Sequence, residues 1–179
     1  MVLVARTWTG REPLRAGEQT QAISKEEPMI QVRPYTPDDD DFILSLAPRL
    51  AIGKQPWRDL TLWLDTVKEW LTESIHQHNQ KTIVLIAEDK LGKQLGFATV
   101  SHSTHFTGQR QAYIGELVTS ETAEGRGVGS ALVQACEQWA REQGYRIITL
   151  TTGAGNARAR RFYGHLGFHE EDITFTKLL

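Results

Sequence analysis

The feature of this sequence that most constrains its fold is a junction between an apolar strand and a helix, which carries three alternating glycines. Residues 115–119 read Gly-Glu-Leu-Val-Thr, and residues 124–132 read Glu-Gly-Arg-Gly-Val-Gly-Ser-Ala-Leu. Glycines let the backbone approach a bulky anion because they carry no Cβ. The first turn of a helix adds unpaired N–H groups and a partial positive charge. The junction therefore predicts a phosphate-binding loop.

Three classes of phosphate-binding loop carry such glycines, and their flanking residues distinguish them. A nucleoside triphosphate loop requires Lys followed by Ser or Thr directly after its last glycine, whereas Ser-Ala follows here. A dinucleotide loop requires glycine at position 130 and an acid about 20 positions later. Position 130 is Ser, and residues 146–152 contain no acid. The pyrophosphate of coenzyme A is bound by the pattern R/Q-x-x-G-x-G/A. Residues 124–129 match both of its glycines, with Glu124 where Arg or Gln is usual.

A second motif lies 27 residues beyond the glycine loop and decides between these classes. Its spacing is N-x-x-A-x-x-F-Y-x-x-L-G-F, formed by Asn156, Ala159, Phe162, Tyr163, Leu166, Gly167 and Phe168. This spacing resembles the closing motif of the GNAT superfamily of N-acetyltransferases. The two motifs occur in the right order and at the right separation, and the resemblance spans about residues 30–178. We therefore identify the chain as GNAT-like.

The resemblance implies a role for each matching position. In GNAT proteins the pantetheine arm of acetyl-CoA pairs like an extra strand with the backbone of a splayed strand, here Leu117, Val118 and Thr119. The Asn of the closing motif, here Asn156, commonly contacts the pantetheine arm, and the Tyr, here Tyr163, usually lies beside the thioester sulfur. The pyrophosphate lies on the amides of the glycine loop. The coenzyme-binding residues implied there are Gly125, Arg126, Gly127, Val128, Gly129 and Ser130.

Acetyl transfer to an amine makes three chemical demands, and the sequence offers candidates for them. The oxyanion of the tetrahedral intermediate needs a fixed donor, for which we predict the Val118 amide. The leaving thiolate, with a thiol pKa of about 8.5, needs little help, so Tyr163 is either its general acid or a packing residue. An amine with a pKa of about 10.4 is mostly protonated at pH 7, so a base or an anionic pocket is expected. Strand alternation puts Glu116 on the same face as Val118, where it is either this group or a solvated or salt-bridged acid.

Two positions depart from the family pattern. Glu124 replaces a cation or an amide, and it would repel a pyrophosphate that it faced. Pointing outward at the helix start it would favour the helix dipole, and Arg126 would then supply the positive charge. Thr151 stands five residues before Asn156, where the branch that acetylates ribosomal-protein N-termini typically carries a catalytic Glu. This substitution argues against a protein N-terminus as the substrate.

The composition is that of one globular domain. The chain has 179 residues and a formal charge of −2, which gives no basic field for nucleic acid. Its one cysteine, Cys136, excludes an internal disulfide, fits a reducing compartment and is predicted to be a buried hydrophobe. No apolar stretch has the length of a membrane span, and we expect a cytoplasmic protein that does not bind membranes. Residues 1–28 are expected to form a flexible arm, and residues 29–179 a single GNAT-like domain.

Periodicity predicts an α/β (α+β) fold, with a mixed sheet and helices on both faces. The resemblance to GNAT proteins implies that this sheet is mostly antiparallel and that its strands splay apart at the coenzyme site. Strands are predicted at residues 30–33, 82–88, 94–103, 112–119, 146–151 and 173–178. Helices are predicted to begin at Thr36, to cover 59–78, to follow the glycine loop as far as Gly144, and to follow Asn156. Trp57 and Trp70 are either core residues or a wall of the substrate site. The loops 50–59 and 101–111 are expected to shape the acceptor pocket. His102 and His105 lack the partners of a zinc site, and no metal is expected.

We therefore predict an acetyl-CoA-dependent N-acetyltransferase that acts on the primary amine of a small molecule, by direct attack in a ternary complex. No covalent acyl-enzyme is expected, because Cys136 is predicted to be buried. The alternatives are acetylation of a protein lysine or N-terminus, and a non-catalytic acyl-CoA sensor or interaction module. Arg158, Arg160 and Arg161 are expected either to form a solvated helix face or to reach the 3′-phosphate of the coenzyme. Dimers are common in the family, so a homodimer is a further expectation.

Overall fold

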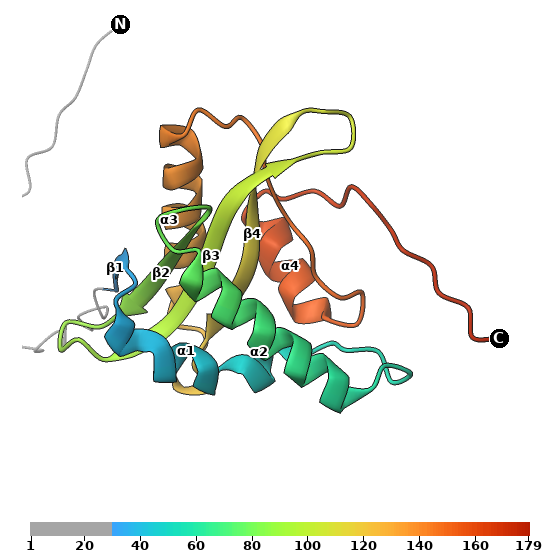
Figure 1. Ribbon diagram of the computed structural model, residues 1–179, viewed down its shortest axis with the longest axis horizontal. Helices are drawn as coiled ribbons and strands as arrows, with labels where there is room; N and C mark the ends of the chain where they lie inside the picture. The colour runs from blue at the N-terminus through green and yellow to red at the C-terminus, as the bar shows by residue number, and fades with distance from the viewer. Residues whose placement is uncertain (1–29) are drawn as a thin grey trace, which may run out of the picture.

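The computed structural model describes residues 30–179, and it contains a five-stranded sheet with helices on both faces (Figure 1). The predicted arm at residues 1–28 lies outside the described residues. The strands are β1 (Gln31–Pro34), β2 (Thr82–Glu88), β3 (Gln94–Thr104), β4 (Arg110–Thr119) and β5 (Ile148–Leu150). The helices are α1 (Asp40–Ser45), α2 (Leu60–His76), α3 (Val128–Glu142) and α4 (Ala157–His165). Short 3₁₀ turns are η1 (Pro37–Asp39), η2 (Ala47–Ala51) and η3 (Glu121–Ala123).

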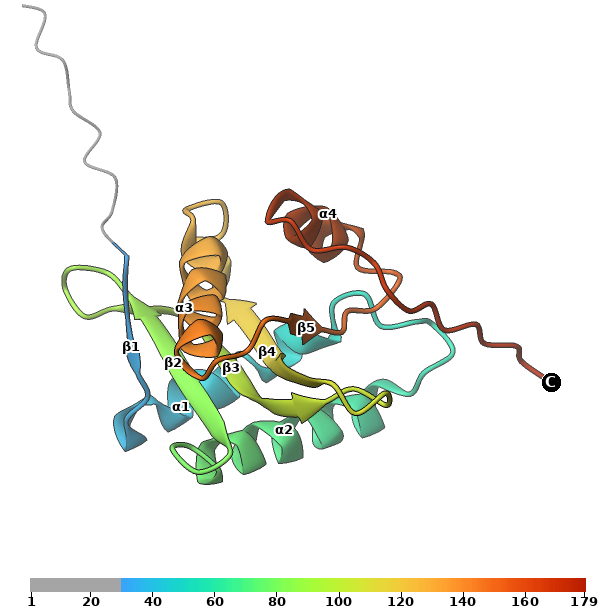
Figure 2. The ribbon, with the colours of Figure 1, turned by 90° about the horizontal axis from the view of Figure 1, so that it is seen from above.

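The strand order β1-β2-β3-β4-β5 follows the chain, and the last pair differs from the others. The strands β1 to β4 are antiparallel neighbours, whereas β5 runs parallel to β4. Pairing between β4 and β5 covers only the residues from Ala112 to Ile114. From Gly115 to Thr119, no described strand pairs with β4 on that side, and the two strands diverge there (Figure 2). The predicted mixed sheet with a splay at this point is confirmed.

The sheet separates two apolar clusters. The helix α3 covers one face and buries Leu132 and Cys136 in the first cluster. The helices α1 and α2 cover the other face and bury Ile43 and Leu71 in the second. Asp59 caps α2 by accepting a 2.9 Å hydrogen bond from a backbone amide of its first turn. None of the helices within residues 30–179 is long and apolar enough to cross a membrane.

The helical turns predicted to begin at Thr36 carry an acidic run at residues 38–41, and one of its members also binds two strands. Asp39 is buried, and its carboxylate accepts hydrogen bonds from Arg33 of β1 at 2.7 Å and 2.8 Å. The amides of Thr36 and Gln94 donate to the same group at 2.8 Å and 2.5 Å. Burial alone would raise the pKa of Asp39, but these bonds outweigh it and lower the pKa to about 2. Asp39 thereby ties β1 and β3 to the first helical turn.

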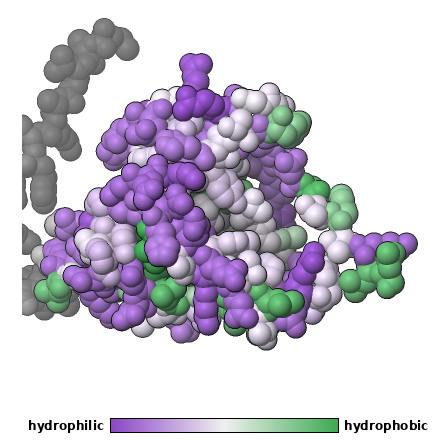
Figure 3. Space-filling view, viewed as in Figure 1, coloured by the Kyte–Doolittle hydropathy of each residue, from purple (hydrophilic) through white to green (hydrophobic). Residues whose placement is uncertain are grey.

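Two predicted strands differ from the structure. The strand predicted at residues 146–151 is reduced to β5, and the strand predicted at residues 173–178 is wrong, because residues 169–179 form no strand. Ile173 and Phe175 are 71% and 91% exposed, and the tail stands away from the body with its hydrophobic residues in view (Figure 3). Alternating apolar residues stabilise a strand only through pairing and side-chain packing. No described strand pairs with this tail.

Candidate active site

The three glycines of the predicted phosphate loop have different structural roles. Gly125 and Gly127 have φ angles of 72° and 83°, in the left-handed region that other residues rarely occupy. Gly127 is the N-cap of α3, so the N–H groups of the first helical turn have no partner within the helix. A Cβ at Gly129 would lie 3.1 Å from the ring of Phe162, so this glycine lets the Phe162 side chain of α4 approach the first turn of α3. The loop combines free backbone donors with a positive helix end, as an anion site requires.

The unpaired stretch of β4 presents an alternating set of backbone groups. The amides of Glu116 and Ser120 donate toward β3, at 3.0 Å and 2.8 Å. Because amide direction alternates along a strand, the Val118 amide also points toward β3, while those of Leu117 and Thr119 point toward the opening beside β5. The oxyanion role predicted for the Val118 amide does not fit this direction. Leu117 and Thr119 offer the edge on which an extended ligand would pair.

Glu116 is buried, at 9% exposure, beside a bulge in the pairing of β3 with β4. Its carboxylate accepts hydrogen bonds from the hydroxyls of Thr99 and Ser74, the latter at 3.4 Å. The Thr99 oxygen already accepts the Glu116 amide, so its own hydrogen is directed to the carboxylate. Burial raises the pKa of Glu116, and the two hydroxyls offset part of that rise. Within the described residues Glu116 is neither a solvated nor a salt-bridged acid.

A hollow of about 220 Å³ lies beside Glu116. Its lining residues come from α2 and from the strands β2 to β4: Trp70, Glu73, Ser74, Thr82, Thr99, Ser101, Tyr113, Gly115 and Glu116. The loops predicted to shape an acceptor pocket contribute only Ser101. The sequence identified Trp70 as a core or substrate-wall residue, and it gave no signal that Glu73 and Ser74 would line the same hollow as Glu116. That juxtaposition comes from packing α2 across the sheet.

Tyr163 lies on α4 and is half-buried beside Phe162 and Phe168, with ring centroids 5.1 Å and 5.6 Å from its own. Burial raises the pKa of Tyr163 to about 12, with a smaller contribution from the Cys136 thiol. A phenol with this pKa stays protonated at neutral pH and can donate a proton. Cys136 is fully buried, as predicted, and burial raises its pKa to about 12, which is typical of an inert core thiol.

Asn156 is the N-cap of α4. Its Oδ1 accepts the Ala159 amide at 3.1 Å, and its Nδ2 donates to the Ile52 carbonyl at 3.4 Å. This approach requires glycine at position 53, because a Cβ there would lie 2.6 Å from the Cβ of Asn156. Asn156 therefore fixes α4 against the loop that follows η2. Its contact with a pantetheine arm stays a prediction.

Glu124 points toward two arginines, an arrangement that differs from both orientations weighed from the sequence. Its carboxylate pairs with Arg49 of η2 and, at 2.5 Å, with Arg158 of α4. The hydrogen bond from Arg158, and then that from Arg49, holds the pKa of Glu124 below its usual value. Arg126 is exposed nearby in the loop. The positive charge around the loop therefore comes from three arginines. Arg126 and Arg158 were candidates from the sequence, whereas no local pattern marked Arg49.

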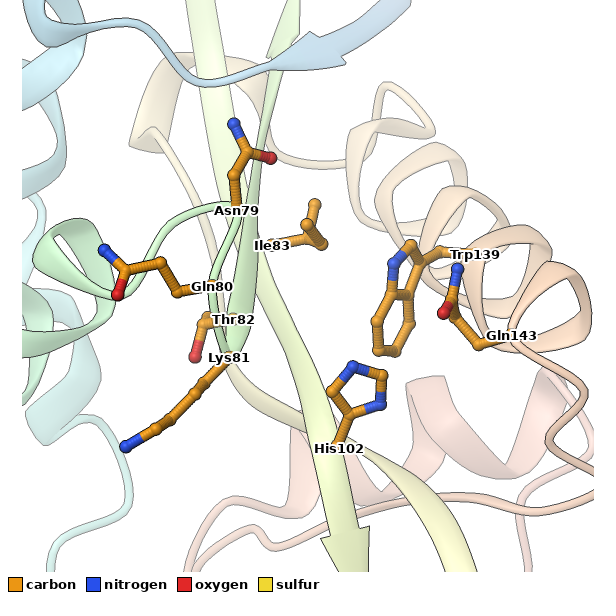
Figure 4. A pocket seen from close by; sticks show the side chains of 8 residues that line it. All are labelled: Asn79, Gln80, Lys81, Thr82, Ile83, His102, Trp139 and Gln143. Carbon is orange, nitrogen blue, oxygen red and sulfur yellow. The ribbon is translucent and has the colours of Figure 1, made fainter.

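A second hollow, of about 190 Å³, is lined by Trp139 and Gln143 at the C-terminal end of α3, whereas the glycine loop precedes the N-terminal end. Figure 4 shows the side chains that line this hollow. The rings of His102 and Trp139 face each other there, with centroids 5.1 Å apart (Figure 4). His102 is exposed, and its Nδ1 lies 2.5 Å from the hydroxyl of Tyr145. Residues 30–179 contain no group of three His, Cys, Asp or Glu side chains that could hold a metal ion. This hollow has no acid in its lining and lies away from the open edge of β4, so we assign it no part in acetyl transfer.

Comparisons of the sequence with known proteins agree with this geometry. The family model described as Acetyltransferase (GNAT) family matches residues 43–168. Human N-acetyltransferase 8 is 28% identical over 141 residues, which cover 75% of this chain and 60% of that protein. The L-methionine sulfoximine/L-methionine sulfone acetyltransferase of Pseudomonas aeruginosa is 31% identical over 85 residues, 48% of this chain and 49% of that protein. The chain spans 37% and 64% of the length of two uncharacterized N-acetyltransferases, from Methanocaldococcus jannaschii and Bacillus subtilis.

Solved structures share the fold. A putative acetyl transferase from Pyrococcus furiosus superposes with a TM-score of 0.68 at 20% identity, over 84% of this chain and 99% of that one. An aminoglycoside N-acetyltransferase solved in complex with coenzyme A has a TM-score of 0.61 at 19% identity, over 84% of this chain and 95% of that one. Identities at this level show the fold alone, and the predicted fold is thereby confirmed.

Proposed function

The chain belongs to the Acetyltransferase (GNAT) family, and from this premise we propose that it moves an acetyl group from acetyl-CoA to the primary amine of a small molecule. The observation that carries the proposal is the open edge of β4, which leads through the glycine loop into α3. The loop amides suit the pyrophosphate, and the backbones of Leu117 and Thr119 suit the pantetheine arm. A coenzyme bound to both runs from the loop toward Gly115, where β4 and β5 begin to diverge. Its thioester end then lies at the apex of the opening.

The acceptor site in this proposal is the hollow beside Glu116. Its volume of about 220 Å³ suits a small molecule rather than a folded protein. Two acids, Glu73 and Glu116, attract a cationic amine, while Trp70 and Tyr113 offer aromatic surface for the rest of the molecule. The Pseudomonas relative is named for acetylating amino acid analogues, and the structural relative for aminoglycosides. Both names support the amine of a small molecule as the acceptor.

The proton transfers of this reaction give roles to Glu116 and Tyr163. An incoming amine is mostly protonated, and Glu116 accepts its proton, because a base acts best when its pKa is raised toward the working pH. The neutral amine attacks the thioester carbonyl, which forms the C–N bond, and the C–S bond then breaks. The Leu117 amide, the nearer of the two free amides to the apex, donates to the oxyanion in between. Tyr163 protonates the departing sulfur, and the proton left on the product nitrogen returns to the phenolate through solvent. Cys136 takes no part, because it is buried.

A thermal melt with acetyl-CoA tests the coenzyme site, with ATP and NAD as controls. Ligand at about 100 times its dissociation constant stabilises a protein by roughly 2.7 kcal/mol, which raises the Tm of a domain of this size by roughly 5–10 °C. A shift with acetyl-CoA alone supports the proposal, and no shift at millimolar acetyl-CoA contradicts it.

Thiol release then tests the acceptor, with L-methionine sulfone, an aminoglycoside and a lysine peptide as amines. Turnover with a small amine is the expected result. Turnover with the peptide alone would establish the protein-acetylation alternative. A melt shift without turnover of any amine would favour the acyl-CoA sensor.

A further inference from the structure

We propose that Glu124 positions Arg49 and Arg158 as a pair of receptors for a phosphate of the coenzyme, so that an acid at the first position of the loop strengthens coenzyme binding. This inference rests on the proposed function, since it concerns the same coenzyme. It reverses the expectation that Glu124 weakens the site by repelling an anion.

Three segments meet at Glu124. The residue directly precedes Gly125 of the phosphate loop, Arg49 comes from η2, and Arg158 is in the first turn of α4. Each carboxylate oxygen takes one guanidinium: Oε1 pairs with Arg49, and Oε2 pairs with Arg158 at 2.5 Å. One acid thus brings together cations that lie 75 and 34 residues away in the chain.

The charge of this cluster favours an anion. Glu124 contributes one negative charge, whereas Arg49 and Arg158 contribute two positive charges, and Arg126 adds a third beside them. A phosphate that approaches the loop therefore meets a positive cluster in which the one acid is already neutralised. The repulsion expected from Glu124 alone is offset by the cations that it holds.

The two arginines also have donors left for a ligand. A guanidinium carries five N–H donors, and Glu124 uses one nitrogen of each. The Arg49 Nε is buried and has no hydrogen-bond partner in the described part of the chain. Because this Nε has almost no accessible surface, the donors that a phosphate can reach are the remaining terminal N–H groups of the two guanidiniums.

Restraint of the arginines is what Glu124 adds. The Arg158 side chain is 66% exposed, so without its partner it would sample many rotamers, and binding a phosphate would then require ordering it. Held by Glu124, Arg158 already stands beside the loop. Planar guanidinium groups that are fixed in this way suit the geometry of phosphate oxygens.

Isothermal titration with coenzyme A, without any amine, tests the proposal. Glu124→Gln keeps the size of the side chain and removes its charge. It should raise the dissociation constant of coenzyme A by about fivefold. Arg158→Gln should raise this dissociation constant at least as much. The dissociation constant of Glu124→Asp should lie between those of Glu124→Gln and the wild type. Glu170→Gln is the matched control, because it breaks the 2.6 Å pair with Arg160 on the same helix and should change the affinity by less than about twofold. The Tm of each unliganded variant reports whether the fold is retained.

The direction of the Glu124→Gln effect decides the outcome. Equal or tighter binding would overturn the proposal, because it would mean that Glu124 only repels the coenzyme. In an Arg49→Gln/Arg158→Gln background, Glu124→Gln should no longer weaken binding, and a loss as large as in the wild type would also overturn it. Dephospho-coenzyme A identifies the phosphate: loss of the Arg158→Gln effect points to the 3′-phosphate, and persistence points to the pyrophosphate. Either result supports the proposal.

The same titration separates this inference from the proposed function. A wild-type protein that binds no coenzyme A would overturn both. A wild type that binds coenzyme A and transfers acetyl groups, while Glu124→Gln binds equally well, would overturn this inference alone.

Discussion

Replacing Thr99 by Val tests how the fold sets the state of Glu116. Thr99 is 2% exposed, and its hydroxyl makes two bonds: it accepts the Glu116 amide at 3.0 Å and donates to the Glu116 carboxylate. Valine has nearly the same shape and lacks the hydroxyl. The change therefore removes both bonds without opening a cavity.

The magnitude follows from what is left unpaired. A buried amide without a partner costs about 1–3 kcal/mol, and each kcal/mol lowers the Tm of a domain of this size by roughly 2–4 °C. The carboxylate also loses the stronger of its two hydroxyl donors, so the pKa of Glu116 should rise further. Because the folded-state pKa of Glu116 lies above its unfolded value, the folded state binds the extra proton, and stability falls as pH rises through that window. Thr99→Val raises the folded-state pKa of Glu116 and leaves its unfolded-state pKa unchanged, so the pH range over which stability falls becomes wider. The loss of stability caused by Thr99→Val should therefore be larger at pH 8 than at pH 4.

Two assays check these expectations. Urea unfolding at several pH values gives the free energy of unfolding, and the pH dependence of thiol release gives the acidic limb of the activity, which should move to higher pH. Thr99→Ser is the control, because it keeps the hydroxyl and should restore the limb at the cost of one methyl group, about 1 kcal/mol. A limb that stays in place or moves to lower pH in Thr99→Val would refute the assignment of Glu116 as a base tuned by Thr99.

Three further predictions concern other parts of the molecule. Gly127→Glu should abolish coenzyme A binding in a titration, because it puts a side chain and a negative charge into the loop; Gly92→Glu, at an equally left-handed glycine with open space around it, carries the same strain and should leave binding intact. Tyr163→Phe should lower turnover by about tenfold with coenzyme affinity nearly unchanged, and equal rates would reduce Tyr163 to a packing residue. Asp39 contributes stability that is present above its unfolded pKa of 3.8 and is lost as pH falls through about 2. Asp39 should therefore contribute about 2 kcal/mol less to the free energy of unfolding at pH 2 than at pH 5, so the wild type should lose about that much more than Asp39→Asn over this range.

Local patterns in the sequence were sufficient for most of the fold. Apolar periodicity located β2, β3, β4, α2 and α3, because the side chains that form these elements also bury their own faces. The glycine loop was equally readable: left-handed backbone at Gly125 and Gly127 is a property of the loop itself. Where periodicity had no neighbouring strand to pair with, as at residues 173–178, it failed.

The sequence by itself determined the family, the position of the phosphate loop and the identity of Glu116 and Tyr163 as candidates. Only the tertiary structure decided what surrounds them. The bonds of Glu116 come from Thr99 and Ser74, 17 and 42 residues away, and these partners carry no mark in the sequence that would pair them with an acid. The burial of the Glu116 carboxylate and the pairing of Glu124 with two arginines both depend on how the helices pack on the sheet. No local pattern encodes such contacts, because their partners become neighbours only when the helices close on the sheet.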